Sequence, residues 1–334
     1  MERILKAAVL GMGNMGRGHA RSLMRMEQVD IAALCSNPVD DARHFAEENH
    51  LVCPVFDDFD RMLDEVPIDV LYICLPPFAH DGQFEKAAER GIHIFIEKPV
   101  ALTAERGMAM AEAARENKII TQVGYQMRFG TAVKKFKEYM DNGRAGRPTL
   151  YMADYECNSL HGPWWRDVKK CGGQVFEQVI HLYDMGLYLM GRASSVNGYI
   201  ANLCHTQVEG YTVEDTSTCS IRFENGALGS VCGSNCSVKN QWNARFRVIC
   251  ENMTADFTDQ NHGVFTFTDK ESVEIVEIAG DTDCTYEEDC YFIGAVLGEH
   301  KAMANIQEGY EGLRLVSAVV ESSGQEGKTV RIHP

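Results

Sequence analysis

The 334-residue sequence predicts an α/β protein of two domains, in which a doubly wound parallel sheet is followed by an α+β domain with a mainly antiparallel sheet. Short apolar runs alternate with helical patterns in the first third of the chain, and strand-like runs follow one another in its last half. The length suits two hydrophobic cores. The pattern changes near Gly124, so we expect domains at residues 1–123 and 124–334, with the closing helices able to pack back on the first domain.

The first domain is expected to alternate strands with helices. Apolar runs predict strands at 4–10, 29–34, 70–74, 92–96 and 119–123. Periodic segments predict helices at 18–25, 40–49, 84–90 and 104–117. Strands and helices that alternate at this spacing indicate a parallel sheet covered by helices on both faces.

The second domain is expected to begin with one long apolar helix over residues 174–190. Strand-like runs follow at 196–204, 216–223, 227–234, 246–250, 263–268 and 273–278, and helices at 288–298 and 308–322 close the chain. Turn signals such as Glu224-Asn225-Gly226 separate some of these runs, which is typical of an antiparallel meander.

Charge and cysteine content narrow the functional classes. With 32 Lys+Arg against 48 Asp+Glu, the formal charge of -16 repels phosphate backbones and acidic membrane surfaces, so we expect no nucleic-acid partner. The twelve cysteines include no C-x-x-C pair, the nearest approach being Cys232 and Cys236, which favours reduced thiols and no metal. No signal peptide or membrane span is recognisable, so we expect a cytoplasmic protein without a membrane partner.

A glycine-rich motif, Gly11-Met12-Gly13-Asn14-Met15-Gly16, follows the first expected strand and opens a helix. In a dinucleotide-binding Rossmann fold the first glycine makes the tight turn, the second admits the pyrophosphate, and the third allows close contact between helix and strand. The alternative is an ordinary glycine-rich turn. The position between strand and helix favours the dinucleotide site.

Two further strand ends belong to the same expected site. After the second strand, Ser36 and Asn37 stand where an acidic residue would hold the ribose of NAD, and no Arg or Lys stands there to bind a 2'-phosphate. We therefore expect NAD to be preferred over NADP. Leu75, Pro76 and His80 follow the strand over residues 70–74, and the prolines there must turn the chain out over the carboxyl edge of the sheet.

The Glu97-Lys98-Pro99 segment ends the next expected strand at the same edge. A lysine there points at the cofactor crevice, where its amine is a useful proton partner. The alternative is a lysine that extends along the protein surface to reach water.

A second cluster lies in the apolar helix expected at 174–190. Glu177, His181 and Asp184 are spaced so that they share one face of a continuous helix. The surrounding residues are apolar on nearly every side, so an acid and an imidazole there must face a cleft or have partners. A histidine in a cleft is a candidate acid or base, whereas the alternative is a solvated face.

These motifs, with the segment Gly124 to Phe129 and the pattern Gly-Gly-x(3)-Glu-x(3)-His-x(2)-Asp, together resemble the glucose-fructose oxidoreductase, inositol dehydrogenase and MocA (Gfo/Idh/MocA) family over nearly the whole chain. The resemblance implies a Rossmann domain, an open-faced antiparallel sheet, and a nicotinamide that meets a polyol or sugar between them. It also implies a cis peptide at Pro99 and catalytic roles for Lys98 and His181. Glu177 replaces the family's usual aspartate, and Cys171 replaces the first of three glycines.

The implied reaction is the oxidation of a secondary hydroxyl of a sugar, glycoside or cyclitol. His181 would remove the hydroxyl proton, Lys98 would hydrogen-bond the same oxygen, and Glu177 would orient the histidine or the substrate. Residues expected to hold the cofactor are Gly11, Gly13, Asn14, Met15, Gly16, Ser36, Asn37, Leu75, Pro76, His80, Glu97, Lys98 and Gln126. Residues expected to hold the substrate are Lys98, Gln126, Arg128, Tyr155, Trp164, Trp165, Arg166, Glu177 and His181.

Alternatives remain at this point. Gln126 and Arg128 could instead brace the two domains, and one of the two tryptophans could simply pack between domains or subunits. A related enzyme class keeps its nucleotide bound, oxidises a sugar transiently and eliminates a substituent, and a non-catalytic sensor could use the same fold. Since an exposed antiparallel sheet face is an obvious subunit contact, we expect a homo-oligomer, either a dimer or a tetramer.

Overall fold

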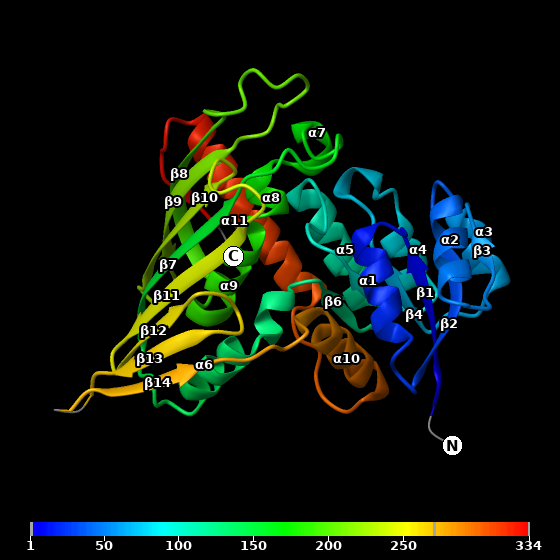
Figure 1. Ribbon diagram of the computed structural model, residues 1–334, viewed down its shortest axis with the longest axis horizontal. Coiled ribbons are helices and arrows are strands. Elements are labelled where there is room, and N and C mark those ends of the chain that lie inside the picture. Colours follow the sequence, from blue (N-terminus) through cyan, green and yellow to red (C-terminus); the bar gives the residue numbers. More distant parts are fainter. Residues whose placement is uncertain (1–2, 270–271, 333–334) are drawn as a thin grey trace. The chain divides into compact units, whose positions relative to one another are not determined.

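A computed structural model describes residues 3–269 and 272–332, which form two compact units. Unit 1 comprises Met1–Tyr125 and Thr285–Tyr310, and unit 2 comprises Gln126–Cys284 and Glu311–Pro334. Each unit contains one large sheet, parallel in unit 1 and mainly antiparallel in unit 2 (Figure 1). The predicted fold class is therefore confirmed.

The sheet of unit 1 has six parallel strands in the order β3-β2-β1-β4-β5-β6. The strands are β1 (Leu5–Leu10), β2 (Val29–Cys35), β3 (Val55–Phe56), β4 (Val70–Ile73), β5 (His93–Ile96) and β6 (Thr121–Val123). The helices are α1 (Asn14–Leu23), α2 (Asp40–Glu48), α3 (Phe59–Glu65), α4 (Gln83–Glu89), α5 (Ala104–Asn117) and α10 (Cys284–Leu297), with a short turn η1 (Pro77–Ala79). The strand order reverses next to β1, so the loops after β1 and β4 open the crevice where such sheets bind ligands.

One hydrophobic core joins this sheet to α1, α2 and α10. Leu5, Val9 and Tyr72 of the sheet pack with Phe45 of α2 and Phe292 of α10, and all five are buried. Helix α10 thus contributes to unit 1 although nearly 160 residues separate it from β6. The position of α10 matters for the site, because this helix brings the side chains of Glu288 and Asp289 into unit 1.

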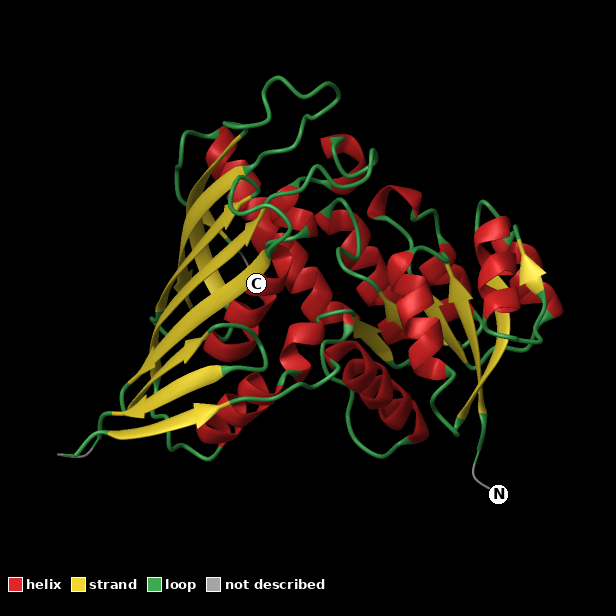
Figure 2. Cartoon of the chain, in the orientation of Figure 1, coloured by secondary structure: helices red, strands yellow, loops and turns green. Residues whose placement is uncertain are grey.

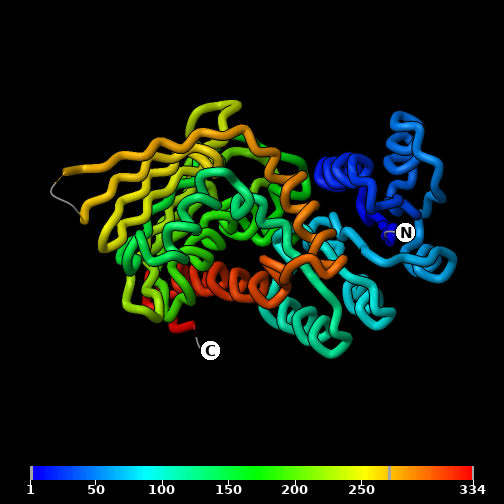
Figure 3. The backbone as a smooth tube through the Cα atoms, turned by 90° about the horizontal axis from the view of Figure 1, so that it is seen from below, coloured from blue at the N-terminus to red at the C-terminus, as the bar shows by residue number. Residues whose placement is uncertain are grey.

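The sheet of unit 2 has nine strands in the order β14-β13-β12-β11-β7-β10-β9-β8-β15. The strands are β7 (Pro148–Cys157), β8 (Ala193–Ala201), β9 (Thr216–Phe223), β10 (Leu228–Ser234), β11 (Trp242–Cys250), β12 (Met253–Phe257), β13 (Gly263–Phe267), β14 (Glu274–Ile278) and β15 (Val330–Arg331). Every neighbouring pair is antiparallel except β7 and β10. Strands β11 to β14 lie side by side as successive hairpins (Figure 3).

Helices cover one face of the nine-stranded sheet (Figure 2). They are η2 (Gln126–Phe129), α6 (Thr131–Asp141), α9 (Ile180–Met190) and α11 (Ile306–Gly324), with α7 (Val168–Cys171) and α8 (Gln174–Glu177) at one end. Phe136 of α6 packs edge-on against Phe257, and Tyr151 donates its hydroxyl hydrogen to Leu182 O of α9 at 2.8 Å. The strands alternate buried and exposed residues, as in Thr216–Phe223, because only one face is covered.

The helix predicted over residues 174–190 is wrong as a single helix. The chain forms α8 and then α9, with a turn at residues 178–179 between them, although Gln178 and Val179 both keep right-handed helical backbone angles. Strands β7 and β12 were also not predicted. The turn at Glu224-Asn225-Gly226 is present, and Gly226 adopts a φ of +89° that favours glycine.

Candidate active site

The glycine loop between β1 and α1 has the local geometry that a dinucleotide requires. Gly11 has φ +92°, and a Cβ there would lie 2.6 Å from the carbonyl oxygen of Cys74. A Cβ at Gly16 would lie only 1.9 Å from Gly11 O. A Cβ at Gly13 would meet no atom within 4 Å, so the space over this backbone is open at the start of α1, where the exposed Asn14 and Met15 follow. The loop therefore fits a pyrophosphate at a helix N-terminus.

The end of β2 supports the same loop. Met12 donates its backbone N–H to Ser36 Oγ at 3.3 Å, and Ser36 is buried, whereas the following Asn37 is exposed. Sequence reasoning missed Arg17, whose Nε donates to Met12 O at 3.0 Å and whose guanidinium lies 3.6 Å from Asp41. Arg17 lies in α1, whereas the sequence was searched for ribose-binding residues at the end of the second strand, so Arg17 was not identified.

His80 joins the loops that follow β4 and β5. Its Nδ1 lies 2.8 Å from Val100 O, and its Nε2 lies 3.3 Å from Leu75 O. Burial lowers the pKa of His80, which favours the neutral ring. Pro76 directly precedes η1, so the prolines turn the chain here as expected.

The Glu97-Lys98-Pro99 segment leaves β5 with a cis Lys98–Pro99 peptide, as the resemblance implied. The Glu97 side chain is buried, and its Oε2 accepts the backbone N–H of Lys98 at 3.0 Å. Gly124 packs on this carboxylate, since a Cβ there would lie 2.8 Å from Glu97 Cδ. Glu97 therefore holds the backbone of the lysine beside it, while the lysine side chain remains partly exposed.

A buried imidazole holds the other oxygen of Glu97. His19 of α1 is fully buried, with Nε2 3.0 Å from Glu97 Oε1 and Nδ1 2.8 Å from Asp289 Oδ1 of α10. Burial opposes protonation, but the charge and hydrogen bond of Asp289 and the hydrogen bond of Glu97 outweigh it and raise the pKa of His19 well above its usual value. Glu288 is also fully buried, and burial raises its pKa well above the usual range. Their surroundings therefore favour the protonated forms of His19 and Glu288.

In unit 2, a chain of hydrogen bonds surrounds Glu177. Trp165 Nε1 donates to Glu177 Oε2 at 2.9 Å, and Gln178 Nε2 donates to the same oxygen at 2.7 Å. Tyr155 donates its hydroxyl hydrogen to Gln178 Oε1, and Tyr155, Trp165 and Glu177 are all buried. Four side chains are therefore locked in one polar array, of which Gln178 was not predicted.

His181 follows this array at the second residue of α9 and is partly exposed. The break before α9 means that Glu177 and His181 do not share the face of one continuous helix. On the same helix, Asp184 forms a buried two-pronged ion pair with Arg128, in which Nε lies 2.9 Å from Oδ2 and the second nitrogen lies 2.6 Å from Oδ1. Arg128 thereby ties η2 to α9.

The remaining candidates lie on two segments of unit 2. Gln126 begins η2 and is partly exposed, and Trp164 directly precedes the buried Trp165. Arg166 donates to the carbonyl oxygens of Leu160 and His161 at 2.8 and 3.1 Å, so it fixes the loop that carries the tryptophans.

Glu214 is a second residue that sequence reasoning missed. Its Oε1 accepts the backbone N–H of Val175 at 2.7 Å, at the start of α8, and its carboxylate lies against Gly173, where a Cβ would be 2.5 Å away. Burial raises the pKa of Glu214 to about 7, although the hydrogen bond from Val175 acts against this rise. The residue lies between two expected strands, in a loop that offers no periodic signal.

Comparisons with known proteins match two regions of the chain to one family. Residues 5–125 match the family model "Oxidoreductase family, NAD-binding Rossmann fold", and residues 133–256 match "GFO/IDH/MocA C-terminal domain". The chain is 32% identical over 238 residues to scyllo-inositol 2-dehydrogenase (NAD(+)) of Bacillus subtilis (strain 168), which covers 71% of this chain and 69% of that protein. It is 26% identical to D-glucoside 3-dehydrogenase of Escherichia coli (strain K12), over 96% of this chain and 95% of that protein.

Solved structures show the same fold. The structure of levoglucosan dehydrogenase in complex with NADH and levoglucosan superposes with a TM-score of 0.90 at 22% identity, over 99% of this chain and 100% of that chain. Among the residues that the structure describes, every helix is too short or too polar to span a lipid bilayer. From its matching domains and its B. subtilis relative, the chain belongs to the Gfo/Idh/MocA family of oxidoreductases, and its first unit is an NAD-binding Rossmann fold.

Proposed function

We propose that the protein is a dehydrogenase that oxidises a secondary hydroxyl of a sugar, glycoside or cyclitol with NAD. The relatives named for scyllo-inositol, myo-inositol, D-glucosides and levoglucosan support this substrate class. The observation that carries the proposal is the array of Tyr155, Trp165, Glu177 and Gln178 next to His181. Fixed aromatic and amide or carboxylate groups can cover the C–H face of a ring and bind its hydroxyls.

In this proposal, His181 removes the proton of the reacting hydroxyl, and the ammonium of Lys98 donates a hydrogen bond to the same oxygen. Bound NAD supplies the hydride acceptor. Glu177 is held by Trp165 and Gln178, so its role is to orient the imidazole or a neighbouring substrate hydroxyl. Glu97 fixes the backbone of Lys98 and so limits the positions its amine can reach.

The cofactor is bound at the carboxyl ends of β1, β2, β4 and β5. Gly11, Gly13 and Gly16 provide the open cradle, and Asn14 and Met15 begin the helix that faces the pyrophosphate. Ser36 and Asn37 lie where the ribose is expected, and Leu75, Pro76, His80, Glu97, Lys98 and Gln126 are the remaining proposed cofactor residues.

The substrate is bound chiefly by side chains of unit 2. The proposed contacts are Lys98, Gln126, Arg128, Tyr155, Trp164, Trp165, Arg166, Glu177 and His181. Because Arg128 is already paired with Asp184, its proposed part is to hold η2 and α9 in place next to the substrate.

A substrate screen tests the proposal. The protein is incubated with NAD and with inositols, free hexoses and glycosides, and NADH is followed by absorbance. We expect net NADH formation with at least one polyol or sugar. Loss of a glycosidic substituent without net NADH would instead indicate the bound-nucleotide eliminating enzyme, and nucleotide binding without turnover of any substrate would indicate a sensor.

The proposal also includes a cytoplasmic homo-oligomer. All twelve cysteines are free thiols, the state expected in a reducing compartment. The uncovered face of the nine-stranded sheet exposes Tyr199, Leu228, Val264 and Ile275, at 57%, 49%, 39% and 60% of their surfaces. Apolar side chains on such a face are typical of a subunit contact. Light scattering after gel filtration should give the molar mass of a dimer or a tetramer. The mass of a monomer would contradict the proposed homo-oligomer.

A further inference from the structure

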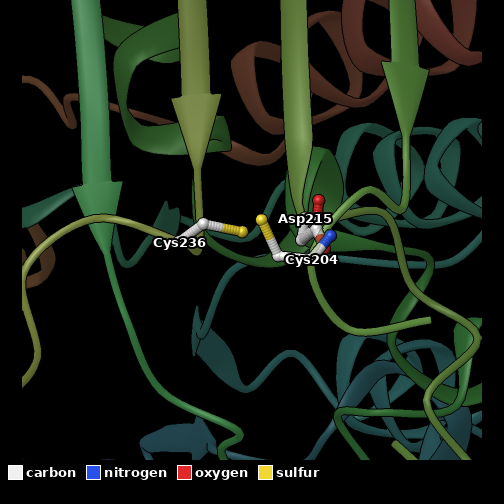
Figure 4. A group of neighbouring side chains, drawn as sticks. All are labelled: Cys204, Asp215 and Cys236. Carbon is white, nitrogen blue, oxygen red and sulfur yellow. The ribbon is translucent and has the colours of Figure 1, made fainter. Parts of the chain in front are cut away.

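Three side chains from separate segments meet at one end of the nine-stranded sheet. Cys204 lies in the loop after β8, Asp215 directly precedes β9, and Cys236 is the second residue after β10. Their ligand atoms all lie within 4.8 Å of one another, and the sulfur atoms of the two cysteines point toward each other (Figure 4). The sequence had drawn attention to Cys232 and Cys236, but the strand direction places Cys232 elsewhere, near Thr218.

Asp215 is held rigidly by the loop around it. Its carboxylate accepts the backbone N–H groups of Leu203, Cys204 and His205 at 2.9, 2.7 and 2.9 Å. His205 Nδ1 also lies 3.1 Å from Oδ2. Thr216 donates its hydroxyl hydrogen to Oδ1 at 3.0 Å, so the fully buried carboxylate is held through both of its oxygens.

The thiols beside this carboxylate form an electronegative group. The sulfur atoms of Cys204 and Cys236 face each other beside the Asp215 carboxylate. Two thiolates next to a carboxylate would repel one another unless a cation balanced their charge. A divalent metal supplies that charge and releases the thiol protons as it binds.

We propose that Cys204, Cys236 and Asp215 form a binding site for a thiophilic divalent cation such as Zn²⁺. Zinc binds sulfur at about 2.3 Å in tetrahedral geometry, which sets two sulfur ligands roughly 3.8 Å apart. The observed convergence within 4.8 Å needs only small side-chain shifts to reach this arrangement. His205 and the loop amides hydrogen-bond the Asp215 carboxylate, as the outer partners of metal ligands commonly do.

The site joins the ends of β8, β9 and β10 and lies close to the array around Glu177. Tyr211 stacks on His205 at 4.7 Å, accepts a hydrogen bond from Asn235 at 3.0 Å, and lies 6.3 Å from the Trp165 ring. A bound metal would therefore stabilise the loop that supports Trp165. This role is structural and independent of the proposed dehydrogenase activity.

Metal titration of the whole protein tests the proposal. Reduced, chelator-treated protein is titrated with Cd²⁺, whose thiolate bonds absorb in the ultraviolet, and with Zn²⁺ followed by elemental analysis after gel filtration. We expect one metal per chain and an increase in Tm with Zn²⁺. Cys204→Ser and Cys236→Ser should each weaken binding at least tenfold, whereas the matched control Cys232→Ser, on an exposed thiol of β10, should bind as the unmodified chain does.

Three results would overturn the proposal. The first is that the protein takes up no stoichiometric metal. The second is metal uptake that neither Cys204→Ser nor Cys236→Ser weakens. The third is that peroxide joins the two thiols in an intramolecular disulfide while the reduced protein binds no metal. Because Cys204 is exposed, Cys204→Ala provides a second variant that should keep the fold, as circular dichroism would show.

Discussion

The Nε2 atom of His19 lies 3.0 Å from Oε1 of Glu97, which connects the helix after the glycine loop to the segment that carries Lys98. The second oxygen of Glu97 binds the Lys98 backbone, and the second nitrogen of His19 binds Asp289. A protonated ring can donate to both carboxylates at once. The cofactor loop and the proposed catalytic lysine therefore share one buried network.

Replacing the buried imidazole should destabilise the protein. His19→Gln removes a charge that is paired with two buried carboxylates, so we expect a loss of about 3 kcal/mol in the free energy of unfolding. Chemical denaturation measures it. The control His44→Gln, on an exposed position of α2, should change stability by less than about 0.5 kcal/mol. A loss in His19→Gln no larger than that of the control would contradict the network.

Glu214 should make stability depend on pH. Its pKa is raised to about 7 in the folded state, so the stability it contributes is complete below its unfolded pKa near 4.5 and is lost as the pH rises through 7. Between pH 5 and pH 8 the protein should lose about 2 to 3 kcal/mol through this group. Glu214→Gln keeps an acceptor for the Val175 N–H and should abolish that loss. Equal pH profiles for the variant and the unmodified chain would refute the assignment.

Gly13 should control cofactor binding without affecting the fold. A Cβ at Gly13 or at Gly18 would meet no protein atom within 4 Å, so alanine fits at both positions. Only at Gly13 would the methyl group occupy the space needed by the pyrophosphate. We expect Gly13→Ala to raise the Kd of NAD at least tenfold at unchanged Tm, and Gly18→Ala to bind NAD normally. Calorimetric titration distinguishes them, and normal NAD binding by Gly13→Ala would place the dinucleotide elsewhere.

The two proposed acid/base residues should be needed for turnover. Lys98→Ala and His181→Ala should each lower kcat by roughly a hundredfold or more, as expected when an acid/base partner is lost. Exposed residues of the same types provide controls, and Lys239→Ala and His44→Ala should keep full activity. A variant of Lys98 or His181 with near-normal kcat would remove that residue from the mechanism.

The sequence predicted those elements whose shape depends on residues that are close together in the chain. The glycine loop needs Gly11 and Gly16 because backbone atoms occupy the space of any side chain, and that requirement is visible in the sequence. In β9, buried and exposed residues alternate because helices cover only one face of the sheet, and this alternation is also visible in the sequence. The end of β5 was also visible in the sequence, because Glu97, Lys98 and Pro99 are not the residues of an ordinary turn.

Other features depend on contacts between distant segments, and the sequence carries no local sign of them. Asp289 meets His19 across 270 positions, and Cys236 meets Cys204 because β10 and β8 both pair with β9. The apolar run over 174–190 has uniform helical character, so it gave no sign of the break at Gln178. At this break the Gln178 side chain donates to the adjacent Glu177 and accepts from Tyr155, and only the bond with Tyr155 joins distant segments.

The most direct test of the central claim is the transfer of deuterium. A substrate identified in the screen is labelled with deuterium at its reacting carbinol carbon, and the NADH formed is examined by mass spectrometry. The account predicts that one deuterium appears in the nicotinamide ring and that the reaction shows a primary isotope effect in single-turnover measurements. Unlabelled NADH, or product formed without any NADH, would contradict hydride transfer from that carbon.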